Sequence, residues 1–411
     1  MPKVFASVDV SSSKIVCLIA QKGSDGRLCI KGASLHEALG IKNGNVINPK
    51  LATQSIVKAV SRAEKIYGKN IENISVGVSG DLLKSKILKT KLNFESRRVI
   101  TKSDMLSMSR EITEELNREE KSAVHIVPIE FAVDGVSTSN PLGISGKNLE
   151  AKFNVFFTKS SKMENLSNCF RKINLVVDNI VFEGLASALA VLNGSEMENG
   201  ALVVDIGAGT TSFAVIRGNR FEFGASLPIG GDNITGDLAN ILDVSFAIAE
   251  RIKIVNTNMF LDKLEENELI KVDIEDDESF RVAGNKKKIV NDIFRSRVQE
   301  IINLVLGIID RKGLFSEFGE MVVTGGIANV PGLDNFIART TNIRTRIGVP
   351  ENFSVSSAIN HSEIKKPTYA TSIGILNFID YIGGKEEVIA PRGIAAVAER
   401  VIGFLTNLFT S

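Results

Sequence analysis

The chain has 411 residues, of which 44% are hydrophobic and 24% charged, and its formal net charge is +1. This composition is typical of a folded protein with roughly two to three core-forming units. The near-zero charge, the absence of Trp and the few Tyr leave no basic or base-stacking surface, so we expect no nucleic-acid partner. Cys17, Cys29 and Cys169 are odd in number and lack metal-ligand spacing, which indicates reduced thiols. We also expect neither a signal peptide nor a membrane-spanning helix, because no apolar run approaches the ~18 residues required.

The first segment, VFASVDVSSSKIVCLIA (residues 4–20), is typical of two strands joined by a polar turn. Asp9 lies at the end of the first strand. The turn contains Ser11, Ser12, Ser13 and Lys14, which offer backbone N–H groups, hydroxyls and one positive charge. A turn of this kind can bind phosphate oxygens.

The next elements are a helix, a strand and a region of different texture. The helix is predicted over residues 50–67, with one apolar face made of Leu51, Ile56, Val57, Val60 and Ile66. A strand follows over 74–80. Residues 82–159 then combine short strands, a charged helix over 101–121 and a turn at Asn140–Gly143, which predicts a small α+β insertion. Residues 175–192 return to a strand followed by a helix.

The segment VVDIGAGTTSFAVI (residues 203–216) repeats the pattern of the first hairpin. Asp205 ends a buried strand, and a second strand begins after a turn of small and hydroxyl residues. That turn consists of Gly207, Ala208, Gly209, Thr210 and Thr211. Two copies of strand, Asp, small turn and strand, placed far apart in the chain, predict a duplicated core.

The remaining elements follow the second hairpin. LPIGGDNITGDLAN begins a helix, for which we expect Thr235 as the N-cap and Asp237 in the first turn. Residues 260–279 are rich in acids, which is typical of a solvated excursion. An amphipathic helix over 291–309 carries Arg295 and Arg297 on its polar side. Residues 321–333 read as a strand, a glycine turn and a helix start, and the globular part is expected to end at Gly383–Gly384.

Four of these features together predict one nucleotide site. The two turns offer phosphate-binding groups, and Asp9 and Asp205 have the chemistry to hold a hydrated Mg²⁺ or organise a water. Glycine pairs allow the backbone to pack against a bulky ligand, and they occur at Gly230, Gly231, Gly325 and Gly326. Each feature alone is often a plain turn, but their joint occurrence in this order favours a nucleotide.

This order of motifs resembles the actin-like ATPase superfamily, and particular segments resemble the FtsA family of bacterial cell-division proteins. The segments are GIKNGNVIN (40–48), HIVPIEFAVDG (125–135), NPLGISGKNLE (140–150), LPIGGDNITGDLA (227–239), AERIK (249–253), RVQEI (297–301) and VVTGGIANVPGL (322–333). The resemblance implies ATP and Mg²⁺ held between two lobes, with Glu250 and Lys253 near the ribose and adenine and Gly325–Gly326 beneath the nucleoside. The family's first loop usually has glycine where this chain has Ser11, which implies a weaker or rearranged phosphate contact. The sequence contains no clear candidate for the base of a hydrolytic reaction, so we expect slow ATP hydrolysis at most.

The resemblance also implies the division of the chain. The fold class is α/β, an actin-like two-lobed ATPase fold with a duplicated core, an inserted α+β subdomain and a C-terminal amphipathic helix. The expected parts are a first lobe (1–81 and 160–194), the insertion (82–159), a second lobe (195–382) with a smaller subdomain at about 232–318, a linker (383–391) and the terminal helix (392–411).

The terminal segment APRGIAAVAERVIGFLTNLFTS has helical periodicity. Its apolar stripe is expected to contain Ile394, Val397, Val401, Phe404, Leu405, Leu408 and Phe409. An interfacial membrane helix fits this stripe, and the alternative is a terminal helix packed on its own domain. The family resemblance implies the membrane interpretation.

The leading functional hypothesis follows from the resemblance. It is an ATP-binding, actin-like polymer with head-to-tail subunits that tethers the tubulin-like protein FtsZ to the inner face of the cytoplasmic membrane at the division site. The C-terminal tail of FtsZ would contact Arg295 and Arg297, whose alternative role is a solvated helix face, and later division proteins would be recruited. The competing hypotheses are a pilus-assembly relative and a small-molecule kinase on the same fold.

Overall fold

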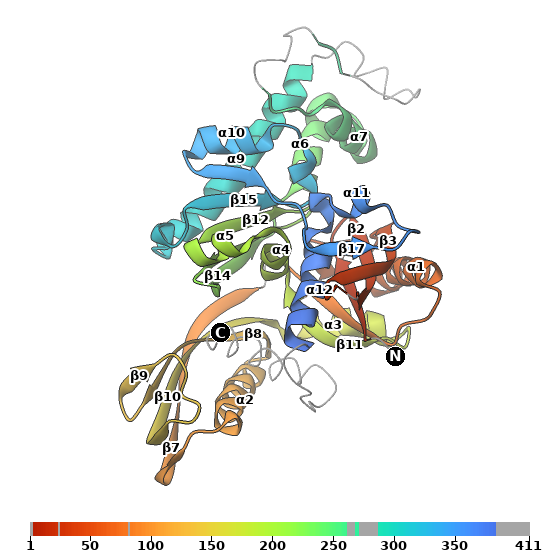
Figure 1. The fold of residues 1–411 in the computed structure, drawn as a ribbon. Helices are drawn as coiled ribbons and strands as arrows, with labels where there is room; N and C mark the ends of the chain where they lie inside the picture. Colours follow the sequence, from red (N-terminus) through yellow and green to blue (C-terminus); the bar gives the residue numbers. More distant parts are fainter. Residues whose placement is uncertain (1–2, 24, 81–82, 261–267, 271–286, 384–411) are drawn as a thin grey trace.

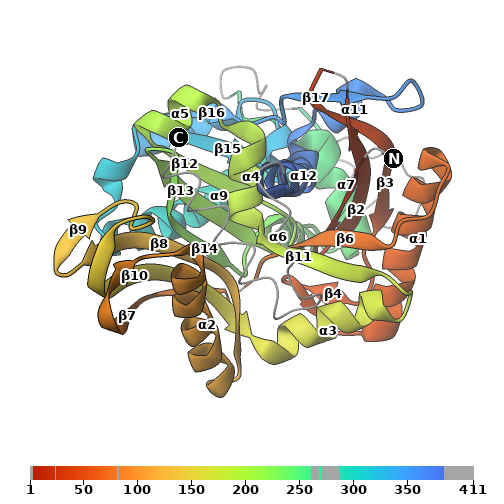
Figure 2. The ribbon, with the colours of Figure 1, turned by 60° about the horizontal axis from the view of Figure 1, so that its bottom comes forward.

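The computed structural model describes residues 3–23, 25–80, 83–260, 268–270 and 287–383. Two β-sheets lie on either side of a shared helical layer, and a smaller subdomain projects from one end (Figures 1 and 2). Most of the acid-rich stretch over 260–279, the linker after Gly383 and the terminal helix expected over 392–411 lie outside the described residues.

The first sheet has the strand order β11-β6-β1-β2-β3-β17. Its strands are β1 (Val4–Val10), β2 (Lys14–Lys22), β3 (Leu28–Glu37), β6 (Asn73–Val78), β11 (Val176–Phe182) and β17 (Phe353–Val355). β1, β2 and β3 are antiparallel, whereas β6 pairs in parallel with both β1 and β11. The first predicted hairpin is therefore the β1–β2 pair, and Asp9 lies one residue before the end of β1.

The second sheet repeats this arrangement, with the order β14-β13-β12-β15-β16. Its strands are β12 (Ala201–Ile206), β13 (Thr211–Arg217), β14 (Arg220–Leu227), β15 (Glu320–Thr324) and β16 (Arg344–Ile347). β12, β13 and β14 are antiparallel, and β15 pairs in parallel with β12 and β16. Strand for strand, this matches β1, β2, β3, β6 and β11. The predicted duplication is confirmed.

Helices cover both faces of each sheet. α1 (Pro49–Tyr67) and α3 (Ser160–Arg171) pack on the outer face of the first sheet. α4 (Glu183–Val191) and α12 (Ala370–Gly383) form the layer between the sheets, with side chains from both sheets in one core. The outer face of the second sheet is covered by α6 (Gly231–Leu242), α7 (Phe246–Asn256), α9 (Lys287–Arg311) and α10 (Leu333–Thr341).

Short elements complete the two lobes. They are β4 (Ile41–Lys42), β5 (Asn45–Val46), α5 (Gly194–Asn199), α11 (His361–Ile364) and the 3₁₀ turns η2 (Phe315–Glu317), η3 (Gly326–Asn329) and η4 (Pro367–Tyr369). In the described part of the chain, no helix is both long enough and apolar enough to cross a membrane.

The start and end of α1 were readable from the sequence, but its buried face was not. The Asn48 side chain caps the first turn, Pro49 follows it, and Gly68 ends the helix in the left-handed conformation. The predicted face was partly wrong, because Leu51, Val57 and Ile66 are exposed. Small residues face the sheet instead, and the helix approaches so closely that a Cβ at Gly32 would lie 2.5 Å from the Ala63 carbonyl oxygen.

The insertion has its own sheet and helix. β7 (Lys84–Val99), β10 (Ser145–Lys159), β8 (Lys121–Val133) and β9 (Val136–Thr138) form a four-stranded sheet in that order. α2 (Lys102–Arg118) packs on one face and closes a separate apolar core. The expected α+β insertion therefore folds around a core of its own, next to β14 of the second lobe and α3 of the first (Figure 2).

The expected extent of the second lobe, residues 195–382, needs correction. β17 pairs in parallel with β3 of the first sheet, and α12 packs in the central layer against α4. The chain therefore returns to the first lobe near its end, because β3 offers an edge that a later strand can extend. The sequence pattern of β17, only three residues long, gave no signal of this return.

Gly374 tests how closely the central layer is packed. A Cβ at Gly374 of α12 would lie 1.7 Å from the Ala186 carbonyl oxygen of α4, so one of the two backbones would have to move. We expect Gly374→Ala to lower the free energy of unfolding by about 3 kcal/mol or more. Gly236→Ala in α6 is the control, because no atom of the described residues lies within 4 Å of its Cβ position. The control should raise stability by about 0.5–1 kcal/mol through helix propensity. Chemical denaturation measures both, and equal effects would contradict the packing.

Candidate nucleotide site

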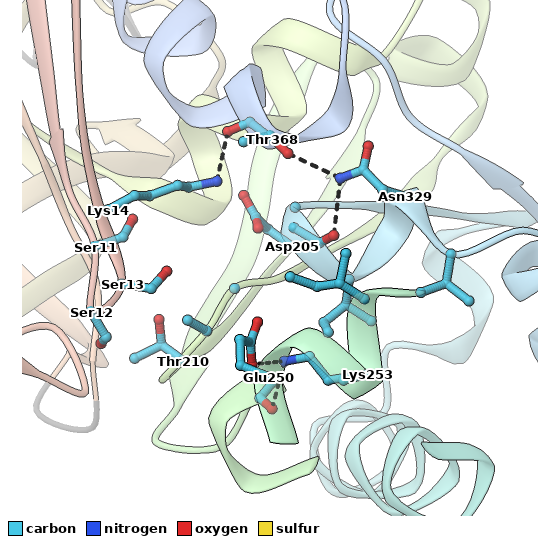
Figure 3. A pocket seen from close by; sticks show the side chains of 18 of the residues that line it. Ser11, Ser12, Ser13, Lys14, Asp205, Thr210, Glu250, Lys253, Asn329 and Thr368 are labelled. Atoms are coloured by element: carbon cyan, nitrogen blue, oxygen red, sulfur yellow. Dashed lines mark hydrogen bonds and ion pairs between the residues drawn. The ribbon is translucent and has the colours of Figure 1, made fainter. Parts of the chain in front are cut away.

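A cavity of about 450 Å³ opens between the two lobes. It is lined by both predicted turns, by the N-terminal ends of α4 and α6, by α7 and by the glycine turn after β15. Figure 3 shows Ser11, Ser12, Ser13 and Lys14 on one wall, and Glu250 and Lys253 near the second turn. The predicted convergence of two hairpins on one cavity is therefore present in the structure.

The first turn is held by short internal contacts. The Ser11 N–H donates to the Lys14 carbonyl, and the Ser11 hydroxyl donates to Asp9 Oδ1 at 2.9 Å. Lys14 Nζ crosses the cavity and donates to the Thr368 carbonyl at 3.1 Å. The side chain of Ser11 thus binds Asp9. The weaker or rearranged phosphate contact expected at Ser11 stays a prediction.

The second turn is tied to the start of α6. The Gly207 N–H donates to the Thr210 carbonyl, and this bond closes the turn. The Gly231 and Asp232 N–H groups then donate to the Gly207 and Ala208 carbonyls. The first-turn N–H groups of α6, which have no partner within the helix, are thereby satisfied by the loop.

The two turns meet across the cavity. A Cβ at Gly209 would lie 2.4 Å from Ser12 Oγ, so the second loop approaches the first with no room for a side chain. Ser12 Oγ also accepts a hydrogen bond from the Gly44 N–H at 3.3 Å. Thr210 Oγ1 lies 3.5 Å from Ser79 Oγ, at the end of β6. One ligand could therefore contact both lobes at once.

Three buried carboxyl groups face the cavity, and each is disfavoured as an anion. The pKa of Asp9 is raised to about 6, chiefly by burial and in small part by the nearby Asp205, although Lys14 and the Ser11 hydrogen bond lower it. Burial also raises the pKa of Asp205. Burial, Asp9 and Asp205 raise the pKa of Glu183 well above its usual range. Such a like-charged cluster is a mark of a functional site.

Among the described residues no group of three His, Cys, Asp or Glu side chains is arranged to hold a metal ion, so a Mg²⁺ here would bind at most two carboxylates and keep most of its waters. Glu183 Oε1 is buried and has no hydrogen-bond partner within the described residues. Oxygen ligands are those that Mg²⁺ prefers, and the ion usually keeps several waters while binding one or two carboxylates. Asp9 and Asp205 are the carboxylates that would hold such an ion, and its charge would relieve their mutual repulsion.

Asp205 is fixed by the central helical layer. Ser187 of α4 donates to its Oδ2 at 2.5 Å, and Thr371 of α12 donates to the same oxygen at 3.0 Å. Gly325 closes the other side in the left-handed conformation, where a Cβ would lie 2.3 Å from Asp205 Oδ1. The glycine is required there by both the backbone angle and the space.

The far end of the cavity is more apolar and carries one ion pair. Lys253 Nζ lies 2.6 Å from Glu250 Oε2 and also donates to the Thr235 hydroxyl and the Gly231 carbonyl. The remaining wall consists of Ile254, Thr257, Phe294, Ile327, Val330 and Pro331. A flat apolar ring with polar edges matches this end.

The predicted role of Thr235 as a helix N-cap is wrong. α6 begins at Gly231 after Gly230, whose N–H donates to the Asn233 side chain, so Thr235 lies in the second turn. Its hydroxyl donates to the Gly231 carbonyl and to Glu250 instead. Asp237 is also beyond the first turn. Early glycines start this helix because the loop carbonyls already satisfy its first N–H groups.

Most predicted ligand residues line the cavity, and three lie behind its wall. Gly209 touches Ser12, Thr211 donates through its hydroxyl to the Ile229 carbonyl, and Gly230 packs against the Ala208 carbonyl. The lining members are Asp9, Ser11, Ser12, Ser13, Lys14, Asp205, Gly207, Ala208, Thr210, Gly231, Glu250, Lys253, Gly325 and Gly326.

Sequence reasoning missed several wall residues. Glu183 follows a buried strand directly, a signal that could have been used. Asn329, Thr368 and Thr371 come from turns and a helix with no motif, and the structure alone brings them to the cavity. Asn329 Nδ2 donates to Thr368 Oγ1 at 2.9 Å (Figure 3). Thr368 therefore contacts both Asn329 and, through its carbonyl, Lys14.

The two arginines of α9 differ in their surroundings. Arg297 makes a two-point ion pair with Asp237, at 2.7–2.9 Å, and a further one with Glu300. Arg295 pairs with Asp292 at 3.3 Å through Nη1, while its Nε and Nη2 are buried without an acceptor in the described part of the chain. Both lie away from the cavity lining.

Comparisons with known proteins agree with this geometry. A family model for "Cell division protein FtsA" matches residues 202–374, and one for the "SHS2 domain inserted in FTSA" matches residues 80–157. FtsA of Pseudomonas aeruginosa is 29% identical over 385 residues, covering 92% of this chain and 89% of its own length. FtsA of Borreliella burgdorferi is 30% identical over 380 residues, covering 91% and 90%.

Solved structures show the fold. A chain of the PilM–PilN type IV pilus biogenesis complex is 14% identical with a TM-score of 0.67, covering 90% of this chain and 97% of its own. MreB5 of Spiroplasma citri bound to ADP is 12% identical with a TM-score of 0.53, covering 92% and 96%. The duplicated sheets and the cleft between them thus define a protein of the actin-like ATPase fold. Within that class, the chain belongs to the FtsA family of cell-division proteins.

Asp9→Asn tests whether the carboxyl cluster is strained without a ligand. A raised pKa means that folding disfavours the Asp9 anion. The resulting loss of folding free energy is absent below about pH 4, where Asp9 is protonated in both states, and is complete above about pH 6. At pH 7 we expect the variant to raise the free energy of unfolding by about 1–3 kcal/mol. Denaturant titrations at pH 4 and pH 7 measure this gain. Asp310→Asn, an exposed carboxyl near the end of α9, should change stability by no more than about 0.5 kcal/mol. A destabilised Asp9→Asn at pH 7 would contradict the cluster.

Proposed function

We propose that this cell-division protein binds ATP with Mg²⁺ in the cleft between its lobes. The observation that carries the proposal is the convergence of two Asp-led hairpins, one from each duplicated sheet, on a single cavity. The fold neighbour MreB5 has been solved with ADP and with AMPPNP, which supports a nucleotide for this cleft. The like-charged carboxyl cluster supports a cation beside it.

Each part of the cavity has a proposed role. The N–H groups and hydroxyls of 11–14 and 207–210 bind phosphate oxygens. Lys14 adds a positive charge, although burial lowers its pKa against the opposing effect of Asp9 and Asp205. Asp9 and Asp205 hold the hydrated Mg²⁺, which when bound neutralises phosphate charge. Glu250 and Lys253 contact the ribose and base edges, and the apolar wall near Gly326 contacts the base face.

Turnover is proposed to be slow. Hydrolysis needs a water held in line with the phosphate and a group that orients it. Glu183 is the described residue best placed for this, because it lies at the start of α4, lines the cavity and has a buried Oε1 without a hydrogen-bond partner among the described residues. Burial and the two aspartates raise its pKa well above the usual range, which suits a carboxyl group that would accept a proton from a water. ATP acts mainly as a conformational and polymerisation ligand.

Thermal unfolding with nucleotide tests the ATP proposal. With ATP at 100 times its dissociation constant, Mg·ATP should raise the free energy of unfolding of the wild type by about 2.7 kcal/mol. Removing Mg²⁺ with EDTA should abolish most of the shift. Asp9→Asn should lose the Mg-dependent part although it is more stable when empty, whereas Asp310→Asn should keep it. A wild type that gains no stability from Mg·ATP would overturn the proposal.

The cellular role is proposed from family membership and from the chain's own terminal pattern. We propose that subunits assemble head to tail and bind the cytoplasmic face of the inner membrane through the apolar stripe over 392–411. One such helix binds reversibly, because a few partly buried side chains barely exceed ordering costs. Many helices on one filament bind firmly through avidity. The filament thereby tethers FtsZ and recruits later division proteins.

Arg295 is the proposed contact for the acidic FtsZ tail. Its Nε and Nη2 lack an acceptor among the described residues, and a buried donor without a partner is costly. These two nitrogens are covered in the structure, so a tail carboxylate would reach them once the Arg295 side chain turns outward, and would then supply the missing acceptor. Arg297 is already occupied by Asp237 and Glu300, so its contribution should be smaller.

Vesicle sedimentation with purified FtsZ tests the tether. The full chain should carry FtsZ into the pellet, and deletion of 392–411 should leave both proteins in the supernatant. Arg295→Ala should keep the chain on the vesicles but reduce FtsZ recovery at least several-fold, with Arg297→Ala affected less. Unchanged membrane binding after the deletion would defeat the tether. An equal loss of FtsZ recovery in both arginine variants would contradict Arg295 as the specific contact.

The two alternatives predict different results. A pilus-assembly relative shares the fold but would be expected to lack the membrane-binding terminus, and the family matches favour cell division. A small-molecule kinase would transfer phosphate to an acceptor bound between the lobes. Phosphate transfer to any of a panel of sugars would favour that alternative.

A further inference from the structure

His125 of β8 in the insertion occupies an unusual position. Its side chain is 1% exposed and lies where the insertion meets the rest of the molecule. Burial lowers its pKa to about 3, so the ring is neutral at physiological pH. A neutral, buried histidine is an acceptor on one nitrogen and a donor on the other.

The acceptor of this ring is used by the first lobe. His125 Nε2 accepts a hydrogen bond from the Phe182 N–H at 3.0 Å. Phe182 is the last residue of β11, which forms an edge of the first sheet and therefore has N–H groups that no further strand pairs. The proton of the ring must be on Nδ1, which is buried with no partner in the described structure. The hydrogen bond that His125 makes with the rest of the molecule is therefore the one that its Nε2 accepts from Phe182.

An aromatic cluster surrounds the histidine and joins four parts of the molecule. The ring of Phe378 from α12 lies 5.8 Å from that of His125, and Phe221 from β14 lies 6.5 Å away. Phe156 of the insertion stacks on Phe221 at 4.5 Å and lies 6.4 Å from Phe182. The insertion, both lobes and the central layer therefore share one packed junction.

The residue that His125 binds is next to the cavity. Phe182 is the N-cap of α4 and has no side-chain cap of its own, and Glu183 is the first residue of the helix. Glu183 is 6% exposed and lines the cavity. The Phe182 backbone therefore sets where the Glu183 carboxyl points, and its N–H is fixed from the insertion.

We propose that His125 is a positioning residue that couples the inserted subdomain to the nucleotide cavity through the Phe182 N–H and Glu183. The proposal rests on nucleotide binding in the cleft. A movement of β8 would shift the start of α4 through the His125–Phe182 hydrogen bond. In the opposite direction, a ligand that attracts the Glu183 carboxyl group would pull on the same hydrogen bond. The insertion and the ligand then bias each other's arrangement.

Matched variants test the coupling. His125→Leu removes the acceptor at similar size, and His125→Gln keeps a neutral acceptor near the place of Nε2. Phe131→Leu is the packing control, because Phe131 is buried on the same strand within the insertion's own core and contacts Phe153. The readouts are amide hydrogen exchange over 182–191 and the dissociation constant for Mg·ATP.

His125→Leu should speed exchange at the start of α4 by at least tenfold and weaken Mg·ATP binding several-fold. The dissociation constant of His125→Gln for Mg·ATP should stay within about twofold of the wild-type value, because the glutamine retains an acceptor for the Phe182 N–H. Phe131→Leu should leave the start of α4 unchanged. If His125→Leu and His125→Gln behave alike, or if exchange over 182–191 is unaffected, the positioning role is wrong.

The wild type gives a second test that does not depend on any variant folding. The chain has only three histidines, so ¹⁵N-labelled imidazole signals can be assigned. We expect one ring to be neutral at pH 5.5 with an unprotonated Nε2, and its ¹⁵N shift to move when Mg·ATP is added. Binding without any change in this ring would refute the coupling. Absence of Mg·ATP binding would refute the nucleotide proposal instead, while the exchange comparison would still test whether His125 fixes the start of α4.

Discussion

The structure depends on the gathering of like charges at the point where its two lobes meet. Burial raises the pKa of Asp9, Asp205 and Glu183, and the two aspartates raise that of Glu183 further, with Lys14 as the opposing charge nearby. Such a cluster is unfavourable by itself, and hydrogen bonds from Ser11, Ser187 and Thr371 hold its two aspartates in place. The turns, the glycines beside them and the first turns of α4 and α6 fix these groups before any ligand arrives. This arrangement supports the cation and the nucleotide that we propose for the cleft.

The two helices of the central layer belong both to the wall of the cavity and to the hydrophobic core between the sheets. α4 and α12 touch closely at Gly374 and Ala186, and they also supply Ser187 and Thr371 to Asp205. The same α4 begins at Glu183 and is reached from the insertion through His125. A change at the cavity therefore acts on elements that hold both sheets together. This connection gives a physical route by which the proposed nucleotide would influence the proposed assembly of subunits, since packed layers switch between discrete arrangements rather than deform smoothly.

Much of the fold was predictable because it rests on local signals. The two hairpins, the insertion and the order of helices follow from periodicity, caps and glycine turns, and the family resemblance fixed the class. Other features depend on distant partners. Leu51, Val57 and Ile66 look like a buried face, but close helix–sheet packing selects the alanines of α1 instead. Thr235 looks like a cap, but loop carbonyls start α6 four residues earlier. Glu183, Thr368 and Thr371 reach the cavity only through tertiary packing, as does the return of β17 to the first sheet. A single sequence does not encode such contacts in any short pattern.

The central claim is that both lobes hold one nucleotide through matching turns. It is tested most directly by a crystal structure of the chain with a non-hydrolysable ATP analogue and Mn²⁺ in place of Mg²⁺, in which the anomalous signal locates the metal. We predict one metal peak between the Asp9 and Asp205 carboxylates, with the phosphates contacting 11–14 on one side and 207–210 on the other. A nucleotide bound to one turn alone, or a metal remote from both aspartates, would contradict the account.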